Sequence, residues 1–158
     1  MPSVLFVCTA NQCRSPMAEA LFSQQLDQAG LGEGWRVESA GVWANEGAPA
    51  TAYSRQVLRE RGLDLDNHRS QPVGAELLGE FDLILVMEDR HRAFIQANYP
   101  QAADRVYLLT AMVDQTQNVD DPVWGAEEAY QSTAKELEDL LDRGFERILE
   151  LVTNTSSK

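Results

Sequence analysis

The chain has 158 residues, of which 44% are hydrophobic and 24% are charged, and its formal net charge is −12. This length favours one domain whose core needs no cross-links, because roughly two-thirds of the unfolded surface becomes buried on folding. The negative charge disfavours nucleic acid and anionic membrane surfaces, and we expect neither as a partner. It also repels phosphorylated substrates, so any phosphate site must create its own positive potential.

The N-terminal residues have neither the basic flank nor the small-residue cleavage site of a signal peptide. No apolar run approaches the roughly 18 residues of a membrane-spanning helix, so we expect a cytoplasmic protein. The two cysteines, Cys8 and Cys13, are too few for a disulfide framework, and they share no zinc-ligand spacing with His68 and His91. We therefore expect no metal or other cofactor, and surface or hydrogen-bonding roles for both histidines.

The predicted elements begin with a short apolar strand at 4–7, a pattern typical of strands buried on both faces. Pro16 suits the first turn of a following helix, and Ser15 suits its N-cap. Gly30 ends this helix after Ala29.

Strands and helices continue to alternate along the chain. We predict further strands at 35–40, 81–87 and 106–109, and helices at 50–61, 89–97 and from 126 onward. The last helix carries one apolar stripe that should pack against the sheet. The polar residues 153–158 are expected to form a frayed tail, so the predicted domain covers 1–152.

This alternation predicts the α/β class. We expect a single three-layer domain in which right-handed crossovers cover both faces of a parallel sheet. Ligands of such folds bind beyond the carboxyl ends of the strands, where the strand order reverses. The loops that follow the strands are therefore the places to look for chemistry.

The segment 8–14, which we call the signature loop, has the form Cys-x5-Arg between the first strand and the first helix. A loop that enters a helix can turn backbone N–H groups inward as an anion-binding nest, and Arg14 adds a planar fork for two phosphate oxygens. The same positive potential favours the thiolate of Cys8, which the hydroxyl of Ser15 is near enough to hydrogen-bond. Such a thiolate beneath a bound phosphoryl group is a nucleophile. The alternative is that Cys8 is a small buried residue at a strand end.

The departing group of a phosphate ester still needs a proton, which a carboxylic acid can supply before it takes a proton from water. Asp120 and Asp121 lie in the loop after the fourth strand, and Pro122 keeps Asp121 out of helical geometry. Asp121 could equally cap the last helix, and its residue pattern alone leaves both roles open.

The segment Val7–Ala20, VCTANQCRSPMAEA, resembles the signature of the low molecular weight protein tyrosine phosphatases. The N-terminal position of this segment and the distant pair Asp121–Pro122 are also typical of that family. Further stretches that resemble family segments are 39–41, 68–70 and 82–87. The resemblance covers essentially the whole chain. It implies a four-stranded parallel sheet with phosphotyrosine phosphatase I-like, flavodoxin-like topology, and phosphotyrosine-containing proteins as substrates.

The resemblance also implies a two-step reaction. Cys8 attacks phosphorus while Asp121 protonates the leaving group, and water then hydrolyses the phosphocysteine with Asp121 as base. Loop amides and Arg14 hold the phosphoryl oxygens through both steps. The implied substrate-binding residues are Thr9, Ala10, Asn11, Gln12, Cys13, Arg14 and Ser15, with Trp43 and Trp124 as possible aromatic walls.

Four supporting roles follow from the same resemblance. Asn11 holds a strained loop conformation, Ser15 stabilises the thiolate, and His68 supports the loop by a hydrogen bond. Cys13 matches a second loop cysteine that can form a reversible disulfide with Cys8 under oxidation.

Three positions depart from the family pattern. Ala10 replaces a glycine that is usual in the loop, and Gln12 replaces an apolar residue at its rim. Val123 and Trp124 stand where paired tyrosines are typical, so regulation by tyrosine phosphorylation is not expected there.

Three other functions stay open. An arsenate reductase on the same fold relays electrons through later cysteines, and this chain has none after Cys13. Protein-arginine phosphatases of the family tend to carry Thr where this chain has Gln12. A non-catalytic phosphate-binding module is disfavoured because every residue required for turnover is present. We expect a monomer.

Overall fold

Four parallel strands form the central sheet in the computed structural model, which describes residues 1–156. Their order across the sheet is β2-β1-β3-β4. They span Ser3–Cys8 (β1), Arg36–Gly41 (β2), Leu83–Val86 (β3) and Val106–Leu108 (β4). Every residue of β1 and β3 is buried, which explains their unbroken apolar runs. The predicted α/β fold and its four-stranded parallel sheet are confirmed.

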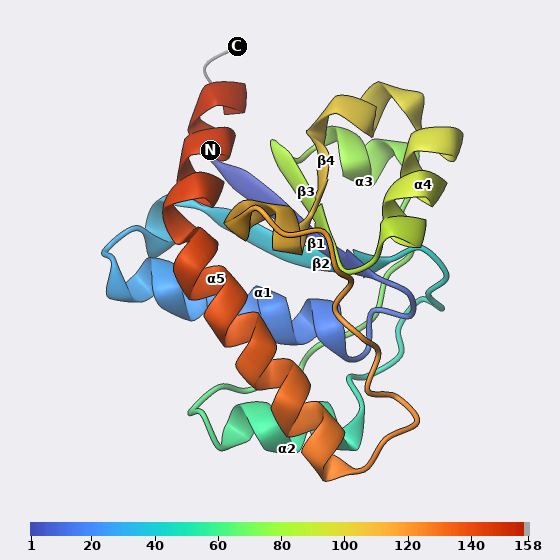
Figure 1. Cartoon of the computed structure of the whole chain (residues 1–158), viewed down its shortest axis with the longest axis vertical. Helices are drawn as coiled ribbons and strands as arrows, with labels where there is room; N and C mark the ends of the chain where they lie inside the picture. The colour runs from blue at the N-terminus through green and yellow to red at the C-terminus, as the bar shows by residue number, and fades with distance from the viewer. Residues whose placement is uncertain (157–158) are drawn as a thin grey trace.

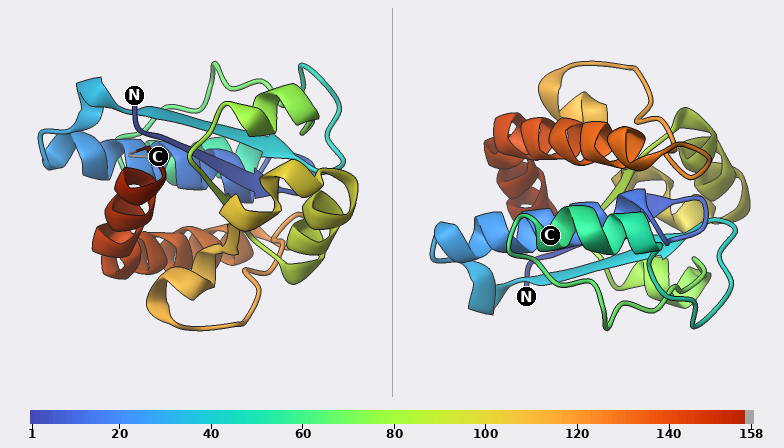
Figure 2. Two further views of the ribbon diagram at one scale, coloured as in Figure 1. Left: turned by 90° about the horizontal axis from the view of Figure 1, so that it is seen from above. Right: turned by 90° about the horizontal axis from the view of Figure 1, so that it is seen from below.

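Helices cover both faces of this sheet, so the molecule has three layers (Figure 1, Figure 2). One side holds α1 (Arg14–Gln28), α2 (Ala52–Arg59) and α5 (Glu127–Ser156), and the other holds α3 (Ala75–Gly79) and α4 (Asp89–Asn98). Short 3-10 helices complete the connections at Gly32–Gly34 (η1), Pro100–Arg105 (η2) and Leu109–Val113 (η3). Among the helices within 1–156, none is long and apolar enough to cross a membrane.

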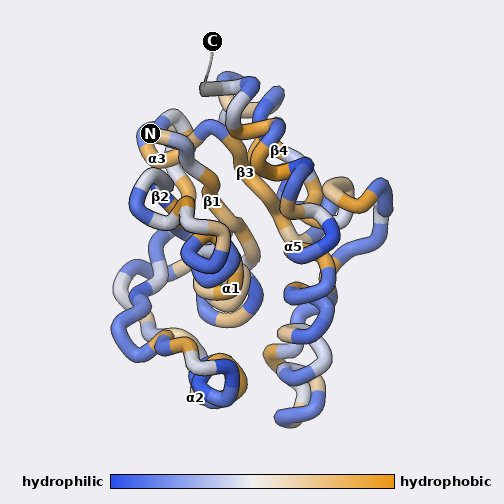
Figure 3. Tube along the Cα trace, turned by 90° about the vertical axis from the view of Figure 1, so that its left-hand side faces the viewer, coloured by the Kyte–Doolittle hydropathy of each residue, from blue (hydrophilic) through white to orange (hydrophobic). Residues whose placement is uncertain are grey.

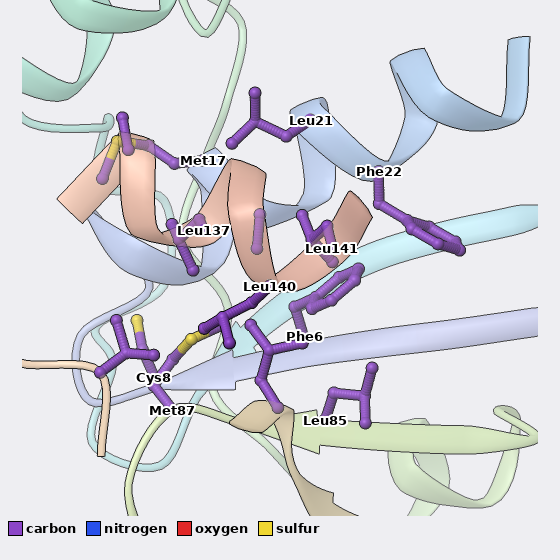
Figure 4. Packing of buried hydrophobic residues seen from close by; sticks show 14 of the residues in the cluster. Phe6, Cys8, Met17, Leu21, Phe22, Leu85, Met87, Leu137, Leu140 and Leu141 are labelled. Atoms are coloured by element: carbon purple, nitrogen blue, oxygen red, sulfur yellow. The ribbon is translucent and has the colours of Figure 1, made fainter. Parts of the chain in front are cut away.

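Alternate side chains of β1 enter two apolar clusters, one on each face of the sheet. Phe6 and Cys8 belong to the cluster under α1 and α5, and Leu5 and Val7 to the one under α3 and α4. Figure 4 shows Cys8 at the carboxyl end of β1, close to core side chains of α5. In Figure 3 the orange that marks hydrophobic residues concentrates on the strands, while the helices carry blue, hydrophilic residues on their outer sides. The side chain of Cys8 therefore packs into the core on the side of the sheet that α1 and α5 cover.

The strand order places a topological switch beside Cys8. The chain leaves β1 through α1 to pair β2 on one side of β1, and later returns to pair β3 on the other side. The order therefore reverses at the carboxyl ends of β1 and β3, where such folds bind ligands. The signature loop begins at that point.

Most predicted elements begin and end within two residues of the observed ones, and two boundaries need correction. Helix α1 begins at Arg14 with Cys13 as N-cap, so Ser15 is not the cap. Its hydroxyl is instead engaged with Cys8 and Asn11.

At the other end of the chain, α5 continues through 153–156, which we had assigned to a frayed tail. The buried side chain of Val152 and the bond from Thr155 Oγ1 to the Leu151 carbonyl oxygen accompany this extension. Residues 157–158 of the predicted tail lie outside the described residues. Helix α3 and the 3-10 helices were not predicted, because segments this short contain too few apolar positions to show a period.

We expect Gly41→Ala to destabilise the protein and displace the signature loop. A Cβ at position 41 would lie 2.5 Å from the carbonyl oxygen of Thr9 and 2.9 Å from the backbone nitrogen of Asn11. Overpacking of this kind lowers the free energy of unfolding by about 1–3 kcal/mol, which denaturant unfolding would measure. Gly79→Ala is the control, since a Cβ there meets nothing within 4 Å. Equal stability of the two variants would contradict this expectation.

Candidate active site

The signature loop turns its carbonyl groups away from its centre. In a trans peptide the N–H group points opposite to the preceding carbonyl, so the loop amides face inward. Inward amides at the start of a helix such as α1 form an anion-binding nest. The outward carbonyl oxygens accept hydrogen bonds from outside the loop in the pairs Cys8–Val42, Thr9–Trp43, Asn11–His68, Gln12–Thr51 and Cys13–Met17.

Asn11 fixes this conformation from within the loop. Its φ of 58° lies in the left-handed region, and its side chain is fully buried. The side-chain amide donates to Ser15 Oγ (2.8 Å) and Ser39 Oγ (2.9 Å), while Oδ1 accepts from the backbone N–H of Gln71 (3.0 Å). The backbone carbonyl accepts from His68 Nε2 at 2.7 Å. All hydrogen-bonding groups of the side chain are thus engaged in holding the loop.

The Cys8 sulfur lies 2.9 Å from the hydroxyl oxygen of Ser15, and both side chains are buried. The Ser15 oxygen already accepts from Asn11, so its one hydrogen has two available acceptors, the sulfur and the carbonyl oxygen of Ala40 at 3.3 Å. When Cys8 is a thiolate, the nearer and charged sulfur takes that hydrogen. The geometry supports the role that the resemblance implied for Ser15.

A partly buried carboxyl group that we did not predict completes this network. The Ser39 hydroxyl donates to Glu19 Oε1 at 2.6 Å, and Ser39 in turn accepts from Asn11. Burial raises the pKa of Glu19 to about 7. Glu19 stands inside the matched segment of the sequence, but its helix position alone gives no sign that it reaches the loop.

Arg14 is buried beside the loop, and its two terminal nitrogens have partners within the protein. Its Nη1 donates to Glu88 Oε2 (2.6 Å) and to the carbonyl oxygen of Val119 (2.7 Å). Its Nη2 lies 3.3 Å from Thr9 Oγ1 and 3.4 Å from Asp121 Oδ2. The buried Nε finds no hydrogen-bond acceptor within residues 1–156. An unsatisfied buried donor next to an anion nest fits an oxygen of a bound phosphoryl group.

Glu88, at the start of α4, anchors Arg14, and the sequence did not reveal it. Burial alone would raise the pKa of Glu88, but hydrogen bonds from Arg90 and Arg14 outweigh it and lower the pKa to about 2. The backbone N–H of Glu88 donates to His91 Nδ1, which leaves His91 Nε2 to donate to Thr9 Oγ1 at 2.9 Å. Burial and the charge of Arg14 lower the pKa of His91 to about 4, so it stays neutral. These residues escape sequence reasoning because they meet the loop only after β3 pairs with β1.

Asp121 reaches the cavity that contains the Cys8 sulfur. This cavity is lined by Cys8, Ala10, Gln12, Cys13, Arg14, Asp121 and Val123. Asp121 Oδ1 accepts from the backbone N–H of Val123 at 3.0 Å, and the side chain is 33% exposed. Because α5 begins only at Glu127, Asp121 does not cap it. Asp120 is exposed and does not line this cavity.

The two tryptophans do not form walls of the Cys8 cavity. Trp43 is 84% exposed and Trp124 is 96% exposed, and neither lines it. The side chains at its rim are those of Gln12 and Val123 instead. Trp43 lines a neighbouring cavity.

Cys13 lines the same cavity as Cys8, and its sulfur lies 3.6 Å from Thr51 Oγ1 and 3.8 Å from the hydroxyl of Tyr130. Burial raises the pKa of the Cys13 thiol. The disulfide with Cys8 stays a prediction. Among residues 1–156, no three His, Cys, Asp or Glu side chains are grouped as a metal site requires.

Comparison with known proteins gives a consistent result. A curated protein-arginine-phosphatase of Bacillus subtilis is 40% identical over 139 residues, which cover 87% of this chain and 91% of that protein. The low molecular weight protein-tyrosine phosphatase A of Mycobacterium tuberculosis is 37% identical over 144 residues, covering 87% and 86% respectively. A solved arginine phosphatase, a Cys-to-Ser mutant with a phosphorylated active-site serine, matches with a TM-score of 0.87 at 37% identity, covering 94% and 95%.

The family model described as low molecular weight phosphotyrosine protein phosphatase matches residues 3–153, nearly the whole chain. Relatives named protein-tyrosine phosphatases are hydrolases that act on phosphoester bonds. The match includes the signature loop, the Arg14 pocket and the Asp121 loop described above. The chain therefore belongs to the low molecular weight phosphotyrosine protein phosphatase family.

Proposed function

We propose that this protein hydrolyses phosphotyrosine in proteins, and aryl phosphates, through a phosphocysteine on Cys8. One observation carries the proposal: Cys8, Arg14 and Asp121 share one cavity at the centre of an inward-facing ring of amides. A nucleophile, a phosphate clamp and a proton donor are the groups that this reaction needs.

In the first step the Cys8 sulfur attacks phosphorus, the S–P bond forms and the bond to the leaving oxygen breaks. Asp121 donates its proton to that oxygen. In the second step a water molecule attacks phosphorus while the Asp121 carboxylate takes its proton, and the P–S bond breaks to restore the thiolate. The amides and the Nε and Nη2 edge of Arg14 hold the other phosphoryl oxygens throughout, so most of the catalysis is positioning and electrostatics. The phosphorylated serine of the solved mutant supports covalent transfer to this position.

We further infer a monomeric protein of the cytoplasm that acts on phosphotyrosine proteins. Both cysteines are free and buried, and a thiolate nucleophile needs a compartment that keeps thiols reduced. One chain carries every residue of the mechanism, which fits a monomer.

Cys8→Ser should reduce hydrolysis of para-nitrophenyl phosphate to background while the unfolding midpoint stays close to that of the wild type. A serine hydroxyl is not ionised by the loop and has no adjacent base.

Arg14→Lys should lower kcat by about 10²-fold or more, because a point charge cannot reproduce two fixed donors. Arg92→Lys, on the exposed side of α4, is the control. Near-wild-type turnover by the Cys8 variant would contradict the mechanism, and by the Arg14 variant would make Arg14 merely structural.

Asp121→Ala should slow hydrolysis of phosphotyrosine, whose leaving group is poor, by about 10² to 10⁴. It should affect far less a substrate whose leaving group needs no proton. Asp120→Ala is the matched control and should cost little, because Asp120 lies outside the Cys8 cavity. If the two variants exchange behaviours, Asp120 is the acid. If neither effect depends on the leaving group, the acid lies in another segment.

Hydrolysis of phosphoarginine is the second candidate, because a relative that is 40% identical is named a protein-arginine-phosphatase. We place tyrosine first because position 12 holds Gln, where arginine phosphatases tend to carry Thr. The Gln12 side chain donates from Nε2 to the carbonyl oxygen of Pro49 at 2.9 Å, so it is held at the rim of the Cys8 cavity.

Two peptides of one sequence, carrying phosphotyrosine or phosphoarginine, separate these candidates. We expect kcat/KM to favour phosphotyrosine by about tenfold or more, and Gln12→Thr to reduce that ratio. Turnover of para-nitrophenyl phosphate by both proteins serves as the common reference. A preference of the wild type for phosphoarginine would overturn the tyrosine assignment and leave the cysteine mechanism in place.

A further inference from the structure

We propose that a second cavity, next to the Cys8 cavity, binds a large apolar side chain two positions from the phosphorylated residue of the substrate protein. The proposal rests on the proposed function, because the phosphoryl group in the signature loop anchors the peptide. We call this cavity the flanking subsite. It has a volume of about 300 Å³ and is lined by Val42, Trp43, Arg90, His91 and Phe94.

The residues that line the flanking subsite form hydrogen bonds with the signature loop. On one side, the backbone N–H groups of Val42 and Trp43 donate to the carbonyl oxygens of Cys8 (3.0 Å) and Thr9 (2.9 Å). On the other side, Arg90 Nη2 lies 2.8 Å from Thr9 Oγ1. Thr9 follows the nucleophile in sequence and contacts both walls of the subsite. In an extended peptide, side chains two positions apart project from the same face and lie about 6.6 Å apart, so the second residue before or after the phosphorylated one can reach this cavity.

The walls of the flanking subsite select an apolar occupant. Trp43 is 84% exposed and Phe94 is 38% exposed, so two large aromatic side chains face water at the same hollow. Apolar surface gathered in this way on a soluble protein marks a contact site. Phe94 packs edge-on against Tyr99, with ring centroids 6.4 Å apart, which steadies this wall. The volume is at the lower end of the range for ligand cavities, about 300–1,000 Å³, and suits a single side chain.

Local charge disfavours an acidic occupant. Both carboxylate oxygens of Glu88 accept from Arg90, at 3.1 and 3.2 Å, and Asp121 lies 3.4 Å from Arg14. Arg90 is therefore already paired with Glu88, and the proposed phosphoryl group uses the charge of Arg14, so little positive charge remains for a second anion. The guanidinium of Arg90 is held in place by Glu88 and Thr9, and its flat face can stack on an aromatic side chain.

Phosphotyrosine peptides that carry either Phe or Ala two positions before or two positions after the phosphorylated residue test this proposal. For the wild type, we expect one of the two Phe positions to raise kcat/KM by about tenfold over Ala, mainly through a lower KM. Phe94→Ala should abolish that preference and leave para-nitrophenyl phosphate hydrolysis unchanged, since this small substrate does not extend into the flanking subsite. Arg92→Ala, on the same helix but outside the cavity, is the control and should keep the preference.

Trp43→Ala provides a second variant for the opposite wall, and the unfolding midpoint of each variant is measured beside its kinetics. Loss of the Phe preference in both Phe94→Ala and Trp43→Ala supports the flanking subsite. Equal turnover of all four peptides by a wild type that hydrolyses para-nitrophenyl phosphate overturns the subsite and leaves the proposed function standing. A preference that survives in Phe94→Ala, or that favours Asp over Phe in the same position, overturns it as well. Absence of any turnover rejects both proposals.

Discussion

The left-handed conformation of Asn11 is the constraint on which the active site depends. An L-residue other than glycine held in such a region costs of the order of 1–3 kcal/mol, which the surroundings must offset. Here the backbone carbonyl is bonded to His68, and the side chain to Ser15, Ser39 and the backbone of Gln71. The loop cannot relax without breaking several buried hydrogen bonds. Its amides are therefore aligned before any phosphoryl group binds, and no reorganisation is needed during the reaction.

A protein with a net charge of −12 still offers an anion site because the positive potential is short-ranged. Backbone amides and the start of α1 contribute partial charges that leave the net charge of the protein unaltered. Surface carboxylates farther than about 8 Å are largely screened at physiological ionic strength. The ion pair of Arg14 with Glu88 fixes one edge of the guanidinium and turns the other toward the cavity. Acidity of the whole chain and affinity of one pocket for phosphate are thus compatible.

The parts of this arrangement that sequence could predict are local. An apolar run before Cys8 indicated β1, and the spacing of Cys8 and Arg14 placed the nest between a strand and a helix. Glu88 and Glu19 could not be found in this way, because tertiary packing alone brings α4 and α1 side chains to the loop. The position of Trp124 outside the lining of the Cys8 cavity escaped the sequence for a related reason. Its residue type suggests a contact, but the direction of a side chain in a loop depends on turns such as the one that Asp121 forms with Val123.

Thr9 connects the chemistry of the loop with the choice of substrate. Its hydroxyl oxygen lies within hydrogen-bonding distance of Arg14 Nη2 (3.3 Å), Arg90 Nη2 (2.8 Å) and His91 Nε2 (2.9 Å). His91 is neutral and its Nδ1 accepts from Glu88, so its Nε2 donates, and three donors compete for the two lone pairs of one oxygen. Arg14 lines the Cys8 cavity, while Arg90 and His91 line the neighbouring cavity that we propose as the flanking subsite. If a side chain bound in the proposed flanking subsite moved Arg90, the contacts of the Thr9 hydroxyl with Arg90 and Arg14 would change together. The proposed substrate recognition and phosphoryl binding would then be linked through one hydroxyl group, because the same oxygen contacts both arginines.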